Sequence, residues 1–412
     1  MTALPGQAAA RARLAAVRPQ DYARTRNHLE GAVTGLSPYL THGLLDLPEV
    51  LAELLASEDL PVQHKLVFEF GWRAYFRHVW AHRGAGIFTS LHAGLLPDAA
   101  YAPELPADIR EARTGLPVID QAVRTLYATG TLHNHARLWL ASYVVHLRKV
   151  HWRAGADWLY AHLLDGDLAS NHLSWQWVAG TGSHQPYLFN AENVARHAPA
   201  AWHCAGSAID TSYEELQAWA RAADQVLAPA GATGVTEPTL HTQAPASLTL
   251  SSPEPAALRD RTVWLVHPWS LSVPPADLPA NTVVLGVYPA DFHRQHPWSA
   301  ARWHFVDAGM AELTPWRCLA DAKTLRPLLS GARQVLAWAE PHLPQWLGEV
   351  AQLREPVPLF APEPRRRDSF SQWWTRATRG RRRAAELLQD HGARKAALLD
   401  YPHARPQPSS RP

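Results

Sequence analysis

The chain has 412 residues, 47% hydrophobic and 18% charged, so it can bury a sizeable core and form two or three domains. A formal charge of +2 does not by itself indicate nucleic-acid binding, and Cys204 and Cys318 are too few for a disulfide framework or a zinc site. No apolar run reaches the length of a membrane span or a secretion signal. We therefore expect a cytoplasmic protein with no membrane contact and no metal ion, and we expect a monomer.

The first half of the chain has apolar residues at helical spacing and few β-branched runs, which is typical of α-helices. The segments with this pattern are 48–57, 63–82, 116–129, 133–150 and 156–164. They predict an all-helical domain over residues 1–226.

Residues 227–258 combine Pro, Ala, Ser, Thr and Gly with almost no charge or apolar periodicity, which predicts a linker. Beyond the linker, two short apolar runs of β type precede two segments with helical character. These are 262–266 and 282–287 for the strands, and 298–313 and 319–329 for the helices. We expect a small Rossmann-like α/β domain over 259–380, followed by a basic, Pro-rich tail over 381–412.

Three polar clusters interrupt the helical region. Residues 165–182 hold two acids, an Asn, two alternating Trp and a Gly-Thr-Gly run, which are costly to bury without shared partners or a ligand. Residues 129–137 end on Arg137, which could pair with a buried carboxylate. In the third cluster, Ser37 is an N-cap candidate before Pro38, and the free amides at such a helix start suit a phosphate.

In the same order, and over nearly all of residues 20–190, these stretches resemble the FAD-binding domain of DNA photolyases and cryptochromes. The matching landmarks are Tyr22 with Arg26, 34–40, 68–78, 114–117, His133 with Asn134, and the DGDLASN…WQW run. No GxGxxG motif is present, which agrees with a family that binds FAD in a helical bowl rather than on a Rossmann strand. The resemblance implies FAD as the cofactor and blue-light-driven electron transfer as the activity.

The resemblance also implies which residues bind the cofactor. Arg137 would pair with Asp165, Asp167 would face the pyrimidine side of the flavin, and Asn171 would contact flavin N5. The full implied set is Tyr22, Thr34, Gly35, Leu36, Ser37, Arg73, Asn134, Arg137, Asp165, Gly166, Asp167 and Asn171.

Electrons would reach the flavin along a chain of aromatic rings. Trp175 and Trp152 match the first two members of the family's chain. Tyr101 lies near the outer position, and Trp80 or Trp158 is the alternative outer donor.

Glu69 matches the family's substrate-binding carboxylate, and Trp72 matches the Trp that stacks on the substrate bases. Trp177 matches a second wall of the substrate cavity, and Leu138 replaces a Met that is common on the substrate side. The loop 183–190 is shorter than usual and lacks the family's Arg, so we expect the protein to hold undamaged DNA weakly. The resemblance implies photorepair of cyclobutane pyrimidine dimers in damaged DNA. The alternatives are a cryptochrome-like light or redox sensor and a degenerate flavin-binding module.

The α/β region faintly resembles the antenna domain that precedes the flavin domain in ordinary family members. Here it would follow the flavin domain, which suggests a circular permutation; the alternative is an unrelated α/β appendage. We expect no antenna chromophore.

Overall fold

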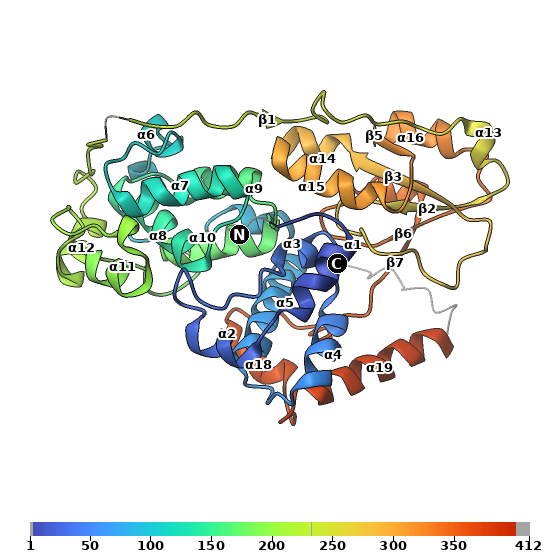
Figure 1. The fold of residues 1–412 in the computed structure, drawn as a ribbon, viewed down its shortest axis with the longest axis horizontal. Coiled ribbons are helices and arrows are strands. Elements are labelled where there is room, and N and C mark those ends of the chain that lie inside the picture. Colours follow the sequence, from blue (N-terminus) through green and yellow to red (C-terminus); the bar gives the residue numbers. More distant parts are fainter. Residues whose placement is uncertain (1–2, 232, 401–412) are drawn as a thin grey trace, which may run out of the picture.

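The computed structural model describes residues 3–231 and 233–400, which form a helical part and an α/β part (Figure 1). Each segment predicted to be helical in the first half holds a helix, so the all-helical prediction is confirmed. The α-helices of this part are α1 (Gln7–Ala15), α2 (Pro19–Thr25), α3 (Ser37–Thr41), α4 (Leu47–Ser57), α5 (Lys65–Arg83), α6 (Ala107–Arg110), α7 (Pro117–Thr129), α8 (Asn134–Ser142), α9 (Trp152–His162), α10 (Leu168–Ala179), α11 (Ala191–His197) and α12 (Tyr213–Arg221). Short 3₁₀ turns cover Gly84–Phe88, Asp98–Ala100 and Ala200–Trp202, and a π-helical turn over Tyr143–Leu147 follows α8.

Side-chain caps fix where the central helices begin. The carboxylate of Asp167 accepts the backbone N–H of Ser170 and starts α10, which ends at Gly180 in the left-handed conformation. His133 caps α8 in the same way by accepting the N–H of His135. Two of the polar clusters noted in the sequence therefore lie where α8 and α10 begin.

The predicted side-chain cap at Ser37 is wrong. Helix α3 begins at Ser37 itself, its N-cap residue is Leu36, and no side chain caps it. Instead, the hydroxyl of Thr34 accepts the N–H of Leu36 at 3.4 Å. A helix of only five residues has few aligned peptide dipoles, so α3 offers a phosphate less than a long helix would.

The α/β part contains a parallel sheet with strand order β5-β3-β2-β6-β7. Val263 on the central strand β2 lies opposite Val283 on β3 and Val335 on β6. Numbered along the chain, the order is 3-2-1-4-5, which is the arrangement of a doubly wound fold. The elements are α13 (Pro255–Leu258), β2 (Thr262–Val266), β3 (Val283–Pro289), α14 (Ala290–Gln295), α15 (Ala300–Ala311), β5 (Arg317–Ala320), α16 (Ala322–Leu329), β6 (Gln334–Trp338), α17 (Leu347–Val350) and β7 (Gln352–Arg354).

The predicted linker carries specific backbone contacts. The N–H groups of Leu227, Ala230 and Val235 donate to carbonyls of the helical part. Farther on, β1 (Leu240–His241) pairs antiparallel with β4 (Trp298–Ser299). The segment runs along the top of Figure 1 as an extended strap between the two parts.

Two helices after the sheet return to the helical part. Helix α18 (Phe370–Ala377) packs on α5, and α19 (Ala385–Asp400) packs on α4 (Figure 1). The ring of Phe370 lies 4.7 Å from that of Phe68. The last residues of the predicted tail, 401–412, lie outside the described residues, and the domain boundaries stay predictions.

Among the described residues, one of three buried hydrophobic clusters is shared by the two parts. Side chains of the helical part, such as Tyr39 and Leu44, belong to the same buried cluster as Trp303 and Phe305 of α15. The rings of Tyr39 and Phe305 are 5.9 Å apart. Within the described ranges, no helix combines the length and apolar character that crossing a membrane requires, and no His, Cys, Asp and Glu side chains gather as a metal site.

Candidate functional site

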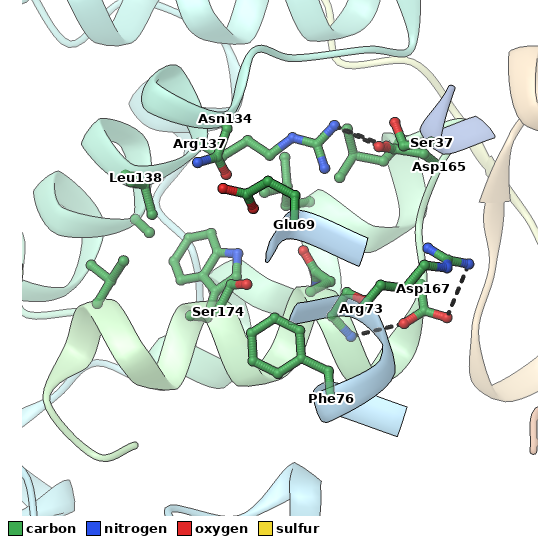
Figure 2. A pocket seen from close by; sticks show the side chains of 17 residues that line it. Ser37, Glu69, Arg73, Phe76, Asn134, Arg137, Leu138, Asp165, Asp167 and Ser174 are labelled. Carbon is green, nitrogen blue, oxygen red and sulfur yellow. Dashed lines mark hydrogen bonds and ion pairs between the residues drawn. The ribbon is translucent and has the colours of Figure 1, made fainter. Parts of the chain in front are cut away.

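A cavity of about 260 Å³ lies among α5, α8, α9 and α10 (Figure 2). Its lining follows the helical repeat, because residues three and four apart share one face of a helix. Helix α10 contributes Ser170, Asn171, Ser174, Trp175 and Val178. The other lining residues are Ser37, Glu69, Arg73, Phe76, Asn134, Arg137, Leu138, Ala141, Leu159, Leu163, Asp165 and Asp167.

The cavity brings together many of the residues singled out in the sequence, from positions as distant as 37 and 175. Those that line it are Ser37, Glu69, Arg73, Asn134, Arg137, Leu138, Asp165, Asp167, Asn171 and Trp175. Their individual roles stay predictions.

The sequence analysis missed several lining residues, including Phe76, Ser170 and Ser174. Helical spacing was the available signal. Asn171 and Trp175 are four residues apart on α10, so Ser170 and Ser174, one residue before each, border the same face.

Trp72 and Trp177, predicted to wall the substrate, do not line the cavity. Each residue along a helix turns by about 100°. Trp177 lies about 200° from Trp175. Trp72 borders the face of α5 that carries Glu69 and Phe76, but its ring packs against Phe370 instead of lining the cavity. Trp177 is 39% exposed.

The ring of Trp72 is covered by the C-terminal helix α18. It stacks on Phe370 with a centroid distance of 3.9 Å and an interplanar angle of 10°. One face of Trp72 is therefore closed to any other ring in this structure.

The remaining predicted cofactor residues, Tyr22, Thr34, Gly35, Leu36 and Gly166, lie outside the lining. A residue that the sequence analysis missed, Arg13, crosses the Thr34–Gly35 turn. Its Nε donates to the Thr34 carbonyl at 2.5 Å, and its Nη2 donates to the Val33 carbonyl at 2.8 Å. A Cβ on Gly35, where φ is +61°, would lie 2.6 Å from Arg13 Nε, so this position accepts no side chain without a shift. Arg13 thus brings positive charge to the turn predicted to hold phosphates.

Gly166 is backed by Arg302, a fully buried residue of α15 in the α/β part. Arg302 donates to the carbonyls of Gly166 at 2.5 Å and Tyr160 at 3.1 Å, and its guanidinium lies 4.0 Å from the Trp298 ring centroid. A Cβ on Gly166 would lie only 2.4 Å from Arg302 Nη1. The α/β part therefore supports the Asp165–Asp167 segment from behind.

The predicted pair of Arg137 and Asp165 is present. Nη2 of Arg137 lies 2.9 and 2.8 Å from the two carboxylate oxygens of Asp165. Burial alone would raise the pKa of Asp165, but Arg137 and Ser37 outweigh burial and lower it. Asp165 is therefore ionised at neutral pH.

Asp167 forms a second charged cluster at the cavity (Figure 2). Arg77 Nη2 lies 2.7 Å from Asp167 Oδ2, and Arg73 Nη2 lies 4.0 Å from the same oxygen. Burial opposes ionisation of Asp167, but Arg77 and Arg73 hold its pKa well below the usual value.

Some polar groups of the lining have no partner among the described residues. The buried hydroxyl oxygen of Ser170 has none, and the Glu69 carboxyl forms no hydrogen bond or ion pair with the described side chains. The Glu69 side chain is exposed, but desolvation by the surrounding protein raises its pKa, and Arg26 and Lys65 only partly oppose that effect. Unsatisfied polar groups in a cavity are costly unless a ligand or water meets them.

Ring contacts connect two of the three predicted electron carriers, Trp152 and Tyr101, and the electron path itself stays a prediction. Trp175 and Trp152 are each 2% exposed, and the Trp152 indole donates to Ser90 Oγ at 3.0 Å. The ring of Tyr101 lies 6.4 Å from His151, which lies 5.6 Å from Trp152. Tyr101 thus approaches Trp152 through His151.

Close packing fixes the inner ring of this path. A Cβ on Gly155 of α9 would lie 2.3 Å from the Trp175 ring. The glycine lets α9 and α10 approach each other with the indole held between them.

Residues 66–221 match the family described as the FAD binding domain of DNA photolyase. Over 213 residues the chain is 33% identical to a deoxyribodipyrimidine photo-lyase of Synechococcus sp., covering 47% of this chain and 43% of that protein. Over 170 residues it is 34% identical to a cryptochrome DASH of Oryza sativa subsp. japonica, covering 39% of this chain and 29% of that protein. A solved cryptochrome of Synechocystis sp. has a TM-score of 0.41 and 30% identity, covering 47% of this chain and 43% of that chain.

The chain spans less than half the length of these relatives, and proteins of both names match it. The family match covers α8, α9, α10 and all of α5 except its first residue, and it leaves out the lining residue Ser37 of α3. Residues 66–221 of the helical part are therefore similar to the FAD-binding domain of DNA photolyases.

Proposed function

We propose that the cavity among α5, α8, α9 and α10 binds the flavin ring of FAD and that the protein carries out light-driven electron transfer. The main support for this proposal is the Ser170 hydroxyl, which has no partner among the described residues and lies beside the two ionised carboxylates Asp165 and Asp167. The Ser170 hydroxyl is left for a hydrogen bond to a polar ring, and the two carboxylates, already held by Arg137 and Arg77, add further acceptors beside it. The family match of residues 66–221 supports the same cofactor.

The cavity of about 260 Å³ suits a planar ring system and is too small for a whole dinucleotide. The rest of FAD would extend past Ser37 to the Thr34–Gly35 turn. There Arg13 supplies the positive charge that a pyrophosphate requires.

When bound, FAD supplies a light-absorbing redox group, and this chain's residues orient it and deliver electrons to it. Asp165, fixed by Arg137, and Asp167, fixed by Arg77, would accept hydrogen bonds from the ring at one edge. Asn171 already donates through Nδ2 to the Ala156 carbonyl at 2.8 Å, so its amide oxygen and its second N–H are left for flavin N5. Electrons would pass from Tyr101 or a neighbouring ring through Trp152 to Trp175.

For the reaction itself we propose photorepair of pyrimidine dimers in DNA. Glu69 supports this function, because its carboxyl lines the cavity, forms no hydrogen bond or ion pair with the described residues and, being exposed, can be reached by a flipped base. A photo-lyase is also among the relatives.

A second candidate is a light or redox sensor without repair activity. The stack of Phe370 on Trp72 favours it, because a repair enzyme needs the face of Trp72 for a flipped base. A sensor needs neither that face nor a grip on DNA.

Two measurements test the proposal. The purified protein should release one FAD per chain on denaturation, and colourless protein that cannot be reconstituted contradicts the cofactor assignment. The FAD-loaded, chemically reduced protein is then mixed with dimer-containing DNA, single- and double-stranded, with and without blue light. Light-dependent repair that is lost in Glu69→Ala but retained in Glu53→Ala, an exposed glutamate of α4, supports the photo-lyase; photoreduction without repair supports the sensor.

A further inference from the structure

The doubly wound sheet has a crevice where such folds usually bind ligands. In this strand order the crevice lies at the carboxyl ends of the neighbouring strands β2 and β6, where the connections leave in opposite directions. The chain after β2 carries Trp269, and the chain after β6 carries Glu340 and His342. The rings of Trp269 and His342 stack at 4.7 Å with an angle of 10°, so the crevice is filled by the protein itself.

His342 reaches from this crevice to the start of α10. Its Nε2 accepts the backbone N–H of Leu168 at 3.3 Å, so its proton lies on Nδ1, which donates to Glu340 at 2.6 Å. The His342 side chain is 0% exposed. Leu168 directly follows Asp167, the carboxylate at the cavity.

Glu340 completes a second route to the same carboxylate. Arg77 pairs with Glu340 through one terminal nitrogen and with Asp167 through the other. The side chain of Asp167 is 1% exposed, and that of Glu340 is 14% exposed. Glu340 thus holds the carboxylate of Asp167 through Arg77, and His342 holds the backbone N–H of Leu168 directly.

The charges in this cluster balance. Arg73 and Arg77 are positive, Asp167 and Glu340 are negative, and His342 is neutral because its Nε2 acts as an acceptor. Removing one member of a buried, paired set leaves an uncompensated charge, which costs more than the pair contributes.

We propose that Glu340 and His342 are positioning residues of the flavin site. The crevice of the α/β part, where a doubly wound fold usually binds a ligand, instead holds the side chains that position Asp167 and Leu168. The inference rests on the proposed function, in which the cavity holds FAD. Neither residue contacts the cavity, so both act through Asp167 and Leu168.

The first test is Glu340→Gln in the full chain, with Glu349→Gln as the matched control. Glu349 also pairs with an arginine of the α/β part, but that pair is about half exposed. In Glu340→Gln we expect the dissociation constant of FAD to rise roughly tenfold or more. We also expect the midpoint potential of the bound flavin to become more positive, because a buried negative charge is lost. The control Glu349→Gln should match the wild type in FAD affinity and in midpoint potential. Equal FAD affinity and potential in the two variants would overturn the proposal.

A double variant separates charge balance from general loss of structure. Arg77→Gln combined with Glu340→Gln removes one charge of each sign, so the potential should return toward the wild-type value. If Glu340 were merely structural, the double variant would be further from wild type than either single variant.

A second readout does not depend on FAD. His342→Phe keeps a ring beside Trp269 but removes the acceptor of the Leu168 amide. In the FAD-free protein, hydrogen exchange at Leu168 should accelerate roughly tenfold or more, while exchange in the sheet stays unchanged. Unchanged exchange at Leu168 would overturn the positioning role. Wild-type protein that binds no FAD would instead contradict the proposed function, and the exchange result would still decide this inference.

Discussion

Arg137 and Asp165 meet at the cavity through one guanidinium nitrogen, Nη2, which lies within 2.9 Å of both carboxylate oxygens. Asp165→Asn should leave the partly buried Arg137 without a counter-charge and lower the free energy of unfolding by about 3 kcal/mol. FAD retention should fall with it. Denaturant unfolding and FAD content measure the two effects. The control Glu192→Gln breaks an exposed pair with Arg196 and should change stability by about 0.5 kcal/mol or less. Unchanged FAD occupancy in Asp165→Asn would remove the pair from the cofactor site.

Ser170 and Ser142 offer a matched comparison of two buried hydroxyls. Ser142 donates to the Tyr187 carbonyl at 2.8 Å, whereas Ser170 Oγ has no partner among the described residues. Ser142→Ala should therefore destabilise the protein by about 1 kcal/mol, and Ser170→Ala should not. For FAD affinity the order should reverse, with a loss of about fivefold in Ser170→Ala, which corresponds to about 1 kcal/mol. Equal FAD affinity in Ser170→Ala and wild type would contradict a hydrogen bond from this hydroxyl to the ligand.

The ring path predicts a defect in photoreduction without a defect in FAD binding. Trp152→Phe and Trp175→Phe keep most of the ring volume but remove the oxidisable indole, so each should slow or abolish light-driven flavin reduction. Trp264→Phe is the control, since Trp264 is 0% exposed but lies on β2 in the sheet. Absorption changes under blue light report the rate. If all three variants behave alike, electrons do not follow this path.

The stack of Phe370 on Trp72 leads to opposite predictions for two variants. If Trp72 stacks on a flipped base, Trp72→Ala should weaken binding of dimer-containing DNA by roughly 1–3 kcal/mol. Phe370→Ala should strengthen it, because the face of Trp72 becomes free. Phe360→Ala is the control, as Phe360 contacts Trp373 and Trp374 of the same helix. Equal DNA binding in Phe360→Ala and Phe370→Ala would show that the cover does not regulate access.

At acid pH, the free energy of unfolding should depend on the ionisation of Glu340. Burial would raise the pKa of Glu340, but Arg77 and His342 lower it to about 2. Because the folded pKa lies below the unfolded one, the stabilisation is complete above about pH 4.3 and is lost as the pH falls toward 2. This contribution amounts to about 3 kcal/mol at most, and Glu340→Gln should lack it. Urea unfolding at pH 5 and pH 3 measures the difference, and parallel curves for the two proteins would contradict it.

The helical part and much of the cavity could be predicted because their signals are local. The spacing of Asn171 and Trp175, with Arg137 at the start of a helix, is visible within short stretches of the chain. The resemblance, however, gave residue identities without the direction of each side chain. Trp177 was therefore predicted beside Trp175, although the helical turn directs it elsewhere. Trp72 was predicted beside Arg73, although its ring stacks on Phe370 from a distant part of the chain.

What the sequence analysis missed depends on contacts between distant residues. Strands β5 and β7 are short and only partly buried, so they lack a clear apolar run, and β5 overlaps a segment predicted to be helical. Strand β6 has an apolar run of four residues, 335–338, which is too short to distinguish a strand from a buried helix. Arg302, Glu340 and His342 support residues 165–168 from more than 130 positions away. No local pattern marks such residues.

The return of α18 to α5 affects how the chain folds during synthesis. Gly71 leaves the space that the Trp374 ring occupies, since a Cβ there would lie 2.4 Å from it. This surface of α5 is made early, but its cover is made about 300 residues later, roughly 15–60 s at ordinary translation rates. During that interval the aromatic face around Phe68 and Trp72 is open to solvent, to chaperones and to other nascent chains. A chain truncated before residue 370 would keep that face exposed permanently and should aggregate, even though every helix that lines the cavity would be intact.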